Sequence, residues 1–145
     1  MTNGATIDPK VTIADERKLI PSWTEKRNEI YLRNRDFFLV HVLEPSKQPH
    51  QKFDIFIFLV RHEGVLKHEG IDFSIEIDYA EFFLGKTWGN RVFKVQNEGK
   101  GKPIGLSTSA YGTFLAICRV VFKDGYEVIL DRYIDFEMGK QVVKS

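Results

Sequence analysis

From residue 36 onward the chain repeats one pattern, in which short apolar runs alternate with turn-forming segments. Runs of this length and periodicity are typical of β-strands, because successive side chains of a strand point to opposite faces. No helical segment long enough to cross between parallel strands separates them, so the strands are expected to pair antiparallel. The sequence therefore predicts an all-β fold, an antiparallel β-sandwich. The predicted strands are DFFLVHVLE (36–44), KFDIFIFLV (52–60), FSIEIDYAEFFL (73–84), RVFKVQN (91–97), FLAICRVVF (114–122) and YEVILDRYIDF (126–136).

Two of these runs allow predictions about individual strand faces. KFDIFIFLV is apolar at nearly every position, as expected of a strand that is buried on both faces. FSIEIDYAEFFL alternates, which predicts that Ser74, Glu76 and Asp78 share one face of the strand. The opposite, apolar face is expected to carry Phe73, Ile75, Ile77 and Tyr79.

The last two runs are joined by Lys123-Asp124-Gly125, and Asp-Gly between apolar runs is a strong signal for a β-hairpin. Cys118 is the only cysteine and lies inside an apolar run without a nearby histidine. It is therefore interpreted as a small buried side chain rather than a catalytic thiol. The side chains predicted to lie near the core are Phe114, Cys118, Val120 and Phe122.

The first 35 residues differ from the rest of the chain. Ser22 and Glu25 have the spacing of a helix capping box, which predicts a short helix over residues 23–33. A strand over residues 29–33 is an alternative that the sequence leaves open. The predicted organisation is an N-terminal extension, partly ordered, over residues 1–35, a β-sandwich domain over 36–138 and a C-terminal tail over 139–145.

Charge and hydropathy argue against several classes of partner. The chain has 21 Lys and Arg against 20 Asp and Glu, a formal net charge of +1, whereas binding to a nucleic-acid backbone needs a strong positive field. No apolar run reaches the length of a membrane span, and the N-terminus lacks the apolar core of a secretory signal. One cysteine permits no internal disulfide, which fits a reducing compartment. We expect a cytoplasmic protein without a membrane or nucleic-acid partner.

The sequence offers no catalytic, metal or cofactor motif with the required spacing. The G-x-S-x-G nucleophile elbow is missing, and Ser107, Thr108 and Ser109 are interpreted as small polar residues before a turn. RHEGVLKHEG (61–70) matches no helical zinc pair, and GKGKP (99–103) lacks the strand-to-helix context of a phosphate loop. A non-enzymatic protein without a cofactor is therefore expected.

Two predicted loops combine an aromatic ring with hydroxyl and glycine residues. LGKTWGN (84–90) places Thr87 and Trp88 directly after a predicted strand, and STSAYGTF (107–114) places Tyr111 directly before another. If both loops meet at one end of the sandwich, the two rings face each other across a slot that suits a flat amide or conjugated group. The alternative is that both rings cap the core.

These two loops resemble the signature loops of the YEATS domain, an immunoglobulin-like module that reads acylated lysine. The family's first loop reads Leu-His-x-Ser-Phe, and the matching residues here are Leu84, Gly85, Lys86, Thr87 and Trp88. The second loop has a small, an aromatic and a small residue, with Phe after a spacer; here these are Ala110, Tyr111, Gly112, Thr113 and Phe114. The resemblance covers residues 50–136. Taken together, the segments LGKTWGN, SAYGTF and DRYIDF are most similar to the prokaryotic branch of the family. That branch is associated with signalling and defence systems.

The resemblance implies a ligand site in these loops. Trp88 and Tyr111 would sandwich the acyl group, Thr87 would hydrogen-bond its amide, and the Tyr111 backbone N–H would hold its carbonyl oxygen. Gly85 stands where the family has His, and Ala110 stands where Gly is common. The implied site residues are Gly85, Thr87, Trp88, Ala110, Tyr111 and Gly112. The implied ligand is an acylated peptide or protein, or a small acyl compound; the alternative function is an immunoglobulin-like protein–protein interaction module in a prokaryotic signalling or defence system.

Overall fold

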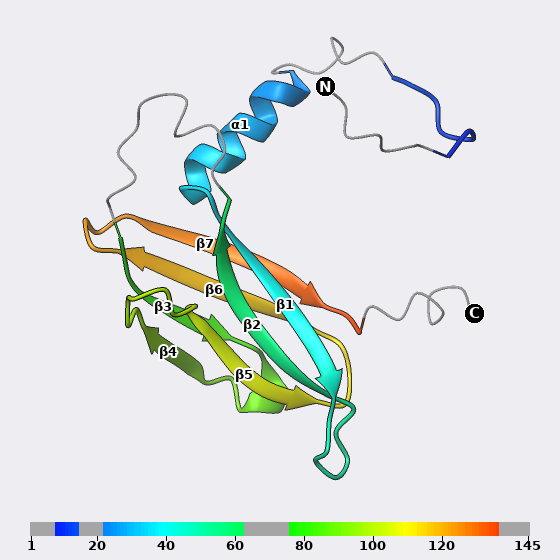
Figure 1. The fold of residues 1–145 in the computed structure, drawn as a ribbon, viewed down its shortest axis with the longest axis vertical. Helices are drawn as coiled ribbons and strands as arrows, with labels where there is room; N and C mark the ends of the chain where they lie inside the picture. The colour runs from blue at the N-terminus through cyan, green and yellow to red at the C-terminus, as the bar shows by residue number, and fades with distance from the viewer. Residues whose placement is uncertain (1–7, 15–21, 63–75, 137–145) are drawn as a thin grey trace.

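The computed structural model describes residues 8–14, 22–62 and 76–136, and its strands form two antiparallel sheets (Figure 1). The three-stranded sheet has the order β1-β2-β5 and the four-stranded sheet has the order β4-β3-β6-β7. The predicted antiparallel, immunoglobulin-like β-sandwich is confirmed. The strands are β1 (Phe37–Pro45), β2 (Phe53–Arg61), β3 (Ile77–Phe83), β4 (Val92–Gln96), β5 (Gly105–Ala110), β6 (Phe114–Phe122) and β7 (Glu127–Ile134).

The core lies between the two sheets. Phe82 of β3 is fully buried, and Cys118, Val120 and Phe122 of β6 belong to the same buried cluster, as predicted. Phe114 is half-buried and packs against this cluster from the first position of β6. Burial raises the pKa of the Cys118 thiol to about 12, so the thiol is neutral at physiological pH and packs as a small apolar side chain.

β3 departs from the predicted alternation. Ile77 is buried, but Tyr79 is only half-buried and Ala80 takes the next fully buried position. The pairing of β3 with β6 shifts its register between Ile77 and Tyr79, and a bulge of this kind sends the side chains that follow it to the opposite face. The prediction that Ile77 and Tyr79 share a face is therefore wrong. Phe73 and Ile75 lie outside the described residues.

β2 is fully buried on one face only, contrary to the prediction from its continuous apolar pattern. Ile55, Ile57 and Leu59 point into the core, whereas Phe56 and Phe58 are half-buried on the outer face of the three-stranded sheet. There the rings of Phe56 and Phe58 stack on each other with their centroids 4.9 Å apart. Ring stacking thus shields part of the apolar surface on this outer face.

β5 is a strand that the sequence did not predict, because GLSTSA lacks apolar alternation. It pairs antiparallel with β2, and its first residue, Gly105, lies opposite Phe58. A Cβ at Gly105 would lie 2.8 Å from Cζ of Phe56 and 2.7 Å from Cβ of Phe58, closer than side chains can approach. Glycine at this position therefore lets the two phenylalanine rings lie over the neighbouring strand.

The helix α1 (Trp23–Asn34) confirms the predicted helix and its capping box. The Glu25 backbone N–H donates to the Ser22 hydroxyl, and the Ser22 backbone N–H donates to the Glu25 carboxylate, each at 3.2 Å. These two bonds satisfy backbone donors that the first helical turn leaves unpaired. The alternative strand over residues 29–33 is wrong.

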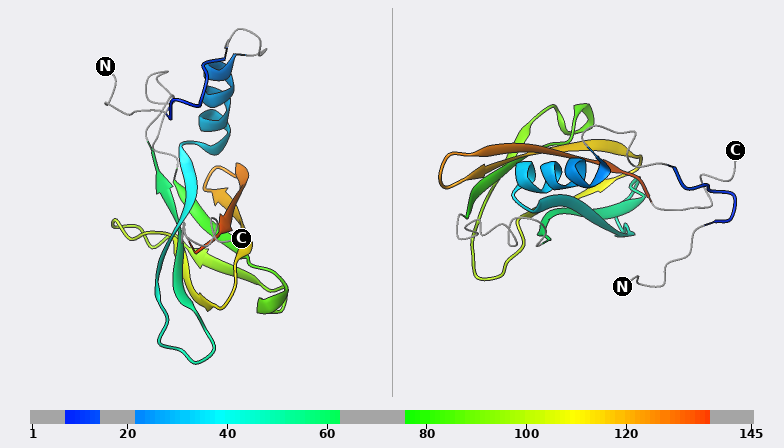
Figure 2. Two further views of the ribbon diagram at one scale, coloured as in Figure 1. Left: turned by 90° about the vertical axis from the view of Figure 1, so that its right-hand side faces the viewer. Right: turned by 90° about the horizontal axis from the view of Figure 1, so that it is seen from above.

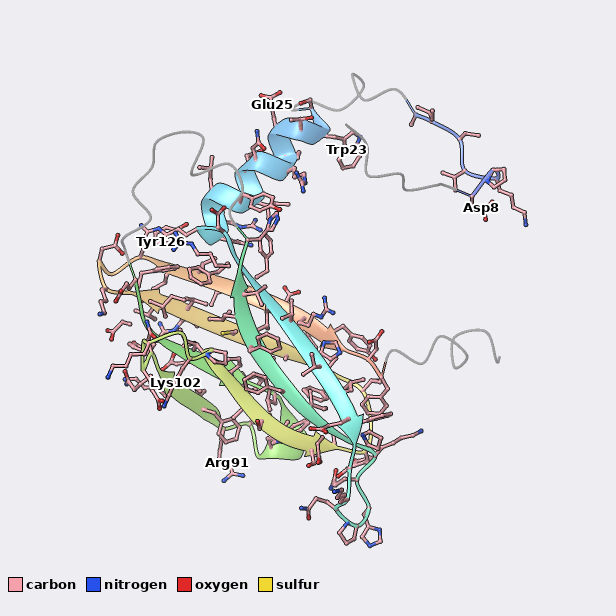
Figure 3. The ribbon with its side chains drawn as sticks, viewed as in Figure 1. Asp8, Trp23, Glu25, Arg91, Lys102 and Tyr126 are labelled. Carbon is pink, nitrogen blue, oxygen red and sulfur yellow. The ribbon has the colours of Figure 1, made fainter. Side chains whose placement is uncertain are left out.

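α1 projects from one end of the sandwich, as Figures 1 and 2 show. Arg35, which follows the helix, donates two hydrogen bonds to the Asp124 carboxylate at 3.1 and 3.0 Å and lies 4.0 Å from the centroid of the Tyr126 ring. The Tyr126 hydroxyl donates to the Arg33 carbonyl oxygen at 2.6 Å, and Figure 3 places Tyr126 at the base of the helix. The predicted β6–β7 hairpin is confirmed, and its turn fixes the helix to the sandwich.

Candidate functional site

The loop between β3 and β4 contains a single 3-10 turn, η2 (Lys86–Trp88), and two glycines shape it. Gly85 has φ +108° and Gly89 has φ +71°, a region of backbone space that favours glycine. The Gly85 carbonyl oxygen accepts hydrogen bonds from the backbone N–H groups of Trp88 and Asn90, both at 3.1 Å. Gly85 therefore sets the backbone path that presents Thr87 and Trp88.

Trp88 is held in place by contacts with both sheets. Its indole Nε1–H donates to the Thr108 hydroxyl of β5 at 2.9 Å, and its ring packs on Phe114 of β6 with centroids 4.6 Å apart at 50°. The Trp88 carbonyl oxygen accepts from Nε of Arg91 at 3.0 Å; Figure 3 shows Arg91 at the end of the molecule away from α1. Because the indole is half-buried and bonded, its orientation is fixed before any ligand arrives.

The loop between β5 and β6 carries Tyr111 between two anchored ends. On one side, Ala110 is buried and its carbonyl oxygen accepts from the Lys52 backbone N–H at 2.9 Å. On the other side, the hydroxyls of Thr113 and Tyr133 form a hydrogen bond of 2.7 Å. The side chain of Tyr111 itself is 66% exposed. The Tyr111 ring is therefore exposed to solvent, on a loop whose two ends are held by hydrogen bonds.

The two loops meet at one end of the sandwich and enclose a pocket of about 270 Å³. Five of the six residues that the resemblance implied, Thr87, Trp88, Ala110, Tyr111 and Gly112, line it. Gly85, the sixth, is not among the described lining residues; its backbone conformation shapes the loop that carries Thr87 and Trp88. The described lining residues are Gln51, Thr87, Trp88, Ser109, Ala110, Tyr111, Gly112, Thr113 and Phe114.

Four of these lining residues were not among the predicted site residues. Phe114 was predicted as a core residue, and it both packs on the core cluster and faces the pocket. Ser109 and Thr113 flank the second loop and could have been found as its hydroxyl neighbours. Gln51 precedes β2, which pairs with β5, so only the strand pairing brings it to the pocket. No local sequence signal marks Gln51.

The chemistry of the pocket is aromatic and hydroxylic. Trp88, Tyr111 and Phe114 supply ring surface, and the Thr87 hydroxyl can donate or accept a hydrogen bond. The hydroxyls of Ser109 and Thr113 also belong to lining residues, but they already bond Asp54 and Tyr133. All of the described lining residues are uncharged. A neutral, flat group with one or two polar atoms fits such a lining, whereas a charged group would lose hydration there without an opposite charge.

No metal site is found within residues 8–14, 22–62 and 76–136, where no group of three or more His, Cys, Asp or Glu side chains is placed to hold an ion. His62, at the start of RHEGVLKHEG, accepts or donates a hydrogen bond at Nδ1 with the Tyr31 hydroxyl at 2.8 Å; residues 63–70 of that segment lie outside the described residues. Over the same described residues, no helix is both long and apolar enough to cross a bilayer.

A β-sandwich whose end loops enclose an aromatic pocket has the architecture of a binding module. Residues 53–135 match the prokaryotic YEATS domain over more than half of the chain. The chain belongs to this family, and the resemblance found over residues 50–136 is confirmed.

Among solved structures, the chain is similar to the Yaf9 YEATS domain recognizing an H3K122suc peptide, with a TM-score of 0.47 and 18% identity. The similarity covers 67% of this chain and 66% of that chain, so the match spans slightly less than two thirds of the Yaf9 chain. No curated protein matches the sequence.

Proposed function

We propose that this chain is a non-enzymatic reader of acylated lysine, or of a similar flat acyl amide, carried on a peptide or protein. The observation that carries the proposal is the uncharged aromatic and hydroxylic lining of the pocket at the loops typical of the family. Acylation converts the lysine ammonium into a neutral amide. A pocket without an opposite charge accepts that amide and disfavours the ammonium of unmodified lysine.

In this proposal the acyl group enters between Trp88 and Tyr111. Trp88 is the rigid wall, because Thr108 and Phe114 hold its ring, and the exposed Tyr111 ring closes the other side. The exposed Thr87 hydroxyl and the Tyr111 backbone N–H are the groups that bond the amide and the carbonyl oxygen. Both rings present flat faces, so stacking supplies the contact area.

The space for the acyl chain is next to Gly112. A Cβ built on Gly112 meets no atom within 4 Å, so this side of the pocket is open. Because the C=C bond of the crotonyl group is conjugated with the amide carbonyl, the whole group is planar. Crotonyl-lysine is therefore expected to stack more fully than acetyl-lysine and to bind at least as tightly. One anchored side chain supports only weak affinity, with Kd about 1 μM to 1 mM.

The test is an amide-shift titration with matched peptides that carry crotonyl-lysine, acetyl-lysine or unmodified lysine at the same position. We expect shifts at Trp88, Tyr111 and Gly112 with the two acylated peptides and much smaller shifts with the unmodified one. If the three peptides give equal shifts, the response does not depend on acylation and the reader function is rejected.

A second candidate function is that of a protein–protein interaction module, and one observation favours it. The outer face of the four-stranded sheet exposes apolar side chains that no described residue covers: Val92 at 58%, Leu115 at 51%, Ile129 at 60% and Tyr133 at 57%. Exposed apolar patches on a folded domain often mark contact surfaces. Substitution of Ile129 by Lys would abolish a partner complex made through this face and leave the pocket titration unchanged.

A further inference from the structure

A second cavity, of about 370 Å³, lies on the outer face of the three-stranded sheet and shares Ser109 with the pocket. Strand pairing arranges its residues in two rows. Glu44, Asp54 and Ser109 lie opposite one another across β1, β2 and β5, and Val42, Phe56 and Ser107 form the next row. Gln48, Ile55 and Thr108 also line the cavity. We call this cavity the acidic groove.

The first row supplies negative charge. The Asp54 carboxylate accepts hydrogen bonds from the hydroxyls of Ser109 at 2.6 Å and Ser46 at 2.7 Å, both at Oδ1. These bonds, from Ser109 first and Ser46 second, lower the pKa of Asp54, and the charge of Lys47 acts in the same direction. Glu44 is exposed beside it. Asp54 is therefore ionised at physiological pH and held in a fixed position.

The second row supplies apolar surface next to that charge. Val42 is 53% exposed, and Phe56 is half-buried because its ring is stacked on Phe58. Ser107 is too short to cover the ring from the neighbouring strand. An apolar wall beside two carboxylates is complementary to a side chain with an aliphatic stem and a cationic head, which describes lysine and arginine.

We propose that the acidic groove binds a basic side chain, lysine or arginine, of the same peptide whose acylated lysine occupies the pocket. This inference rests on the proposed reader function for the identity of the ligand. The two cavities meet at Ser109, so an extended peptide reaches both within a few residues, at about 3.3 Å per residue. The chain is then selective for acyl-lysine in a basic sequence context.

The experiment uses a peptide series with two independent changes. The pocket position carries crotonyl-lysine or alanine, and a position one to three residues away on either side carries arginine or its neutral isostere citrulline. Amide shifts of Trp88 and Tyr111 report the pocket, and those of Glu44 and Ser107 report the groove. We expect arginine to tighten binding of the crotonylated peptide roughly three- to fivefold over citrulline at low salt, with the difference shrinking in high salt.

Glu44→Gln is the test variant, because within the described part of the chain the Glu44 side chain forms no hydrogen bond or ion pair that the fold would lose. It is expected to remove most of the arginine preference and to leave the citrulline peptide unaffected. Glu98→Gln is the matched control: it removes the same charge from an exposed Lys102 pair in the loop between β4 and β5, at the opposite end of β5. It is expected to bind as the parent protein does.

The two hypotheses fail in different ways. If Trp88 and Tyr111 respond to crotonyl-lysine but arginine and citrulline bind equally and Glu44 and Ser107 stay silent, the groove inference is overturned and the reader function stands. If Trp88 and Tyr111 do not respond, the reader function fails. The alanine peptide with arginine then decides the groove alone: shifts at Glu44 and Ser107 that Glu44→Gln abolishes support it, and silence there rejects it.

Discussion

The indole Nε1–H of Trp88 donates to the Thr108 hydroxyl at 2.9 Å. Trp88 follows β3 of the four-stranded sheet, and Thr108 lies in β5 of the three-stranded sheet. One hydrogen bond therefore ties the first loop to the opposite sheet at the mouth of the pocket. The same ring is a wall of the candidate site and a link between the sheets.

Trp88→Ala is accordingly expected to lower both stability and ligand binding. A fully buried Trp or Phe truncated to Ala costs about 3–5 kcal/mol, and the half-buried Trp88 should cost about 2–3 kcal/mol in urea unfolding. Trp88→Phe keeps a smaller ring on Phe114 and removes the Thr108 bond together with part of the packing surface, so its loss should be smaller than that of Trp88→Ala, about 1–2 kcal/mol. A parental unfolding midpoint for Trp88→Ala would show that the inter-sheet contact does not stabilise the domain.

Thr87→Val is expected to separate binding from stability. Thr87 is exposed and lines the pocket, so loss of its hydroxyl should change the free energy of unfolding by about 0.5 kcal/mol or less. Crotonyl-lysine binding should weaken by about 1–3 kcal/mol, because the acyl amide loses a partner. Thr113→Val is the control: it also lines the pocket, but its hydroxyl bonds Tyr133, and it should bind the ligand nearly as well as the parent.

Substitutions at the two glycines in the site loops should have different effects: one should lower stability, and the other should prevent ligand binding. Gly85 has φ +108° and ψ −162°, with open space around its Cβ position, so Gly85→Ala should cost about 1–3 kcal/mol through backbone strain alone. Gly112 has open space without a positive φ; Gly112→Val should fold normally and abolish ligand shifts by filling the pocket. Thermal unfolding and titration of the two variants, side by side, measure both effects.

The Arg35–Asp124 pair predicts a specific dependence of stability on pH. The hydrogen bonds from Arg35 and then from the Tyr126 backbone lower the pKa of Asp124 below its usual 3.8. A carboxylate with a lowered folded-state pKa stabilises the fold above its unfolded-state pKa, and this contribution is lost as the pH falls through the folded-state value. Asp124→Asn should therefore unfold at lower urea than the parent at pH 7, and the gap should narrow as the pH falls below 3.8 and through the lowered folded-state pKa. A gap that persists at low pH would rule out this linkage.

Cys118 should be unreactive in the native state. Burial raises its thiol pKa to about 12, and the thiolate is the form that alkylating reagents attack. Iodoacetamide labelling followed by mass spectrometry should show modification in urea and almost none in native buffer. Rapid native labelling would mean that the four-stranded sheet opens locally around β6.

The fold could be predicted because most strands carry an apolar pattern of their own, and the hairpin at Asp124 carries its turn chemistry. β5 could not be predicted, because GLSTSA has no such pattern and becomes a strand only by pairing with β2. The bulge in β3 could not be predicted either. The register shift between Ile77 and Tyr79 depends on the pairing with β6, and the residue pattern of β3 alone does not indicate it.

For the candidate site, the sequence identified the loop residues and missed their neighbours. Trp88 and Tyr111 were found because their loops resemble those of a known family. Gln51 and the acidic groove were not found, because they depend on which strands lie side by side. Gly85, whose family counterpart is His, is explained only by its backbone angle, which no pattern of side chains reveals.

The contacts of Arg35 with the β6–β7 turn lie at the opposite end of the domain from the pocket. They lie at the Phe122 end of β6, whereas Phe114 and the pocket lie at its other end, and Figure 3 places Trp23, at the start of α1, far from Arg91 beside η2. Anything attached through the start of α1 therefore lies at the end of the domain opposite the pocket. A domain immobilised on a sensor surface through this helix would present its pocket to the solution, whereas attachment near Tyr111 would bury it.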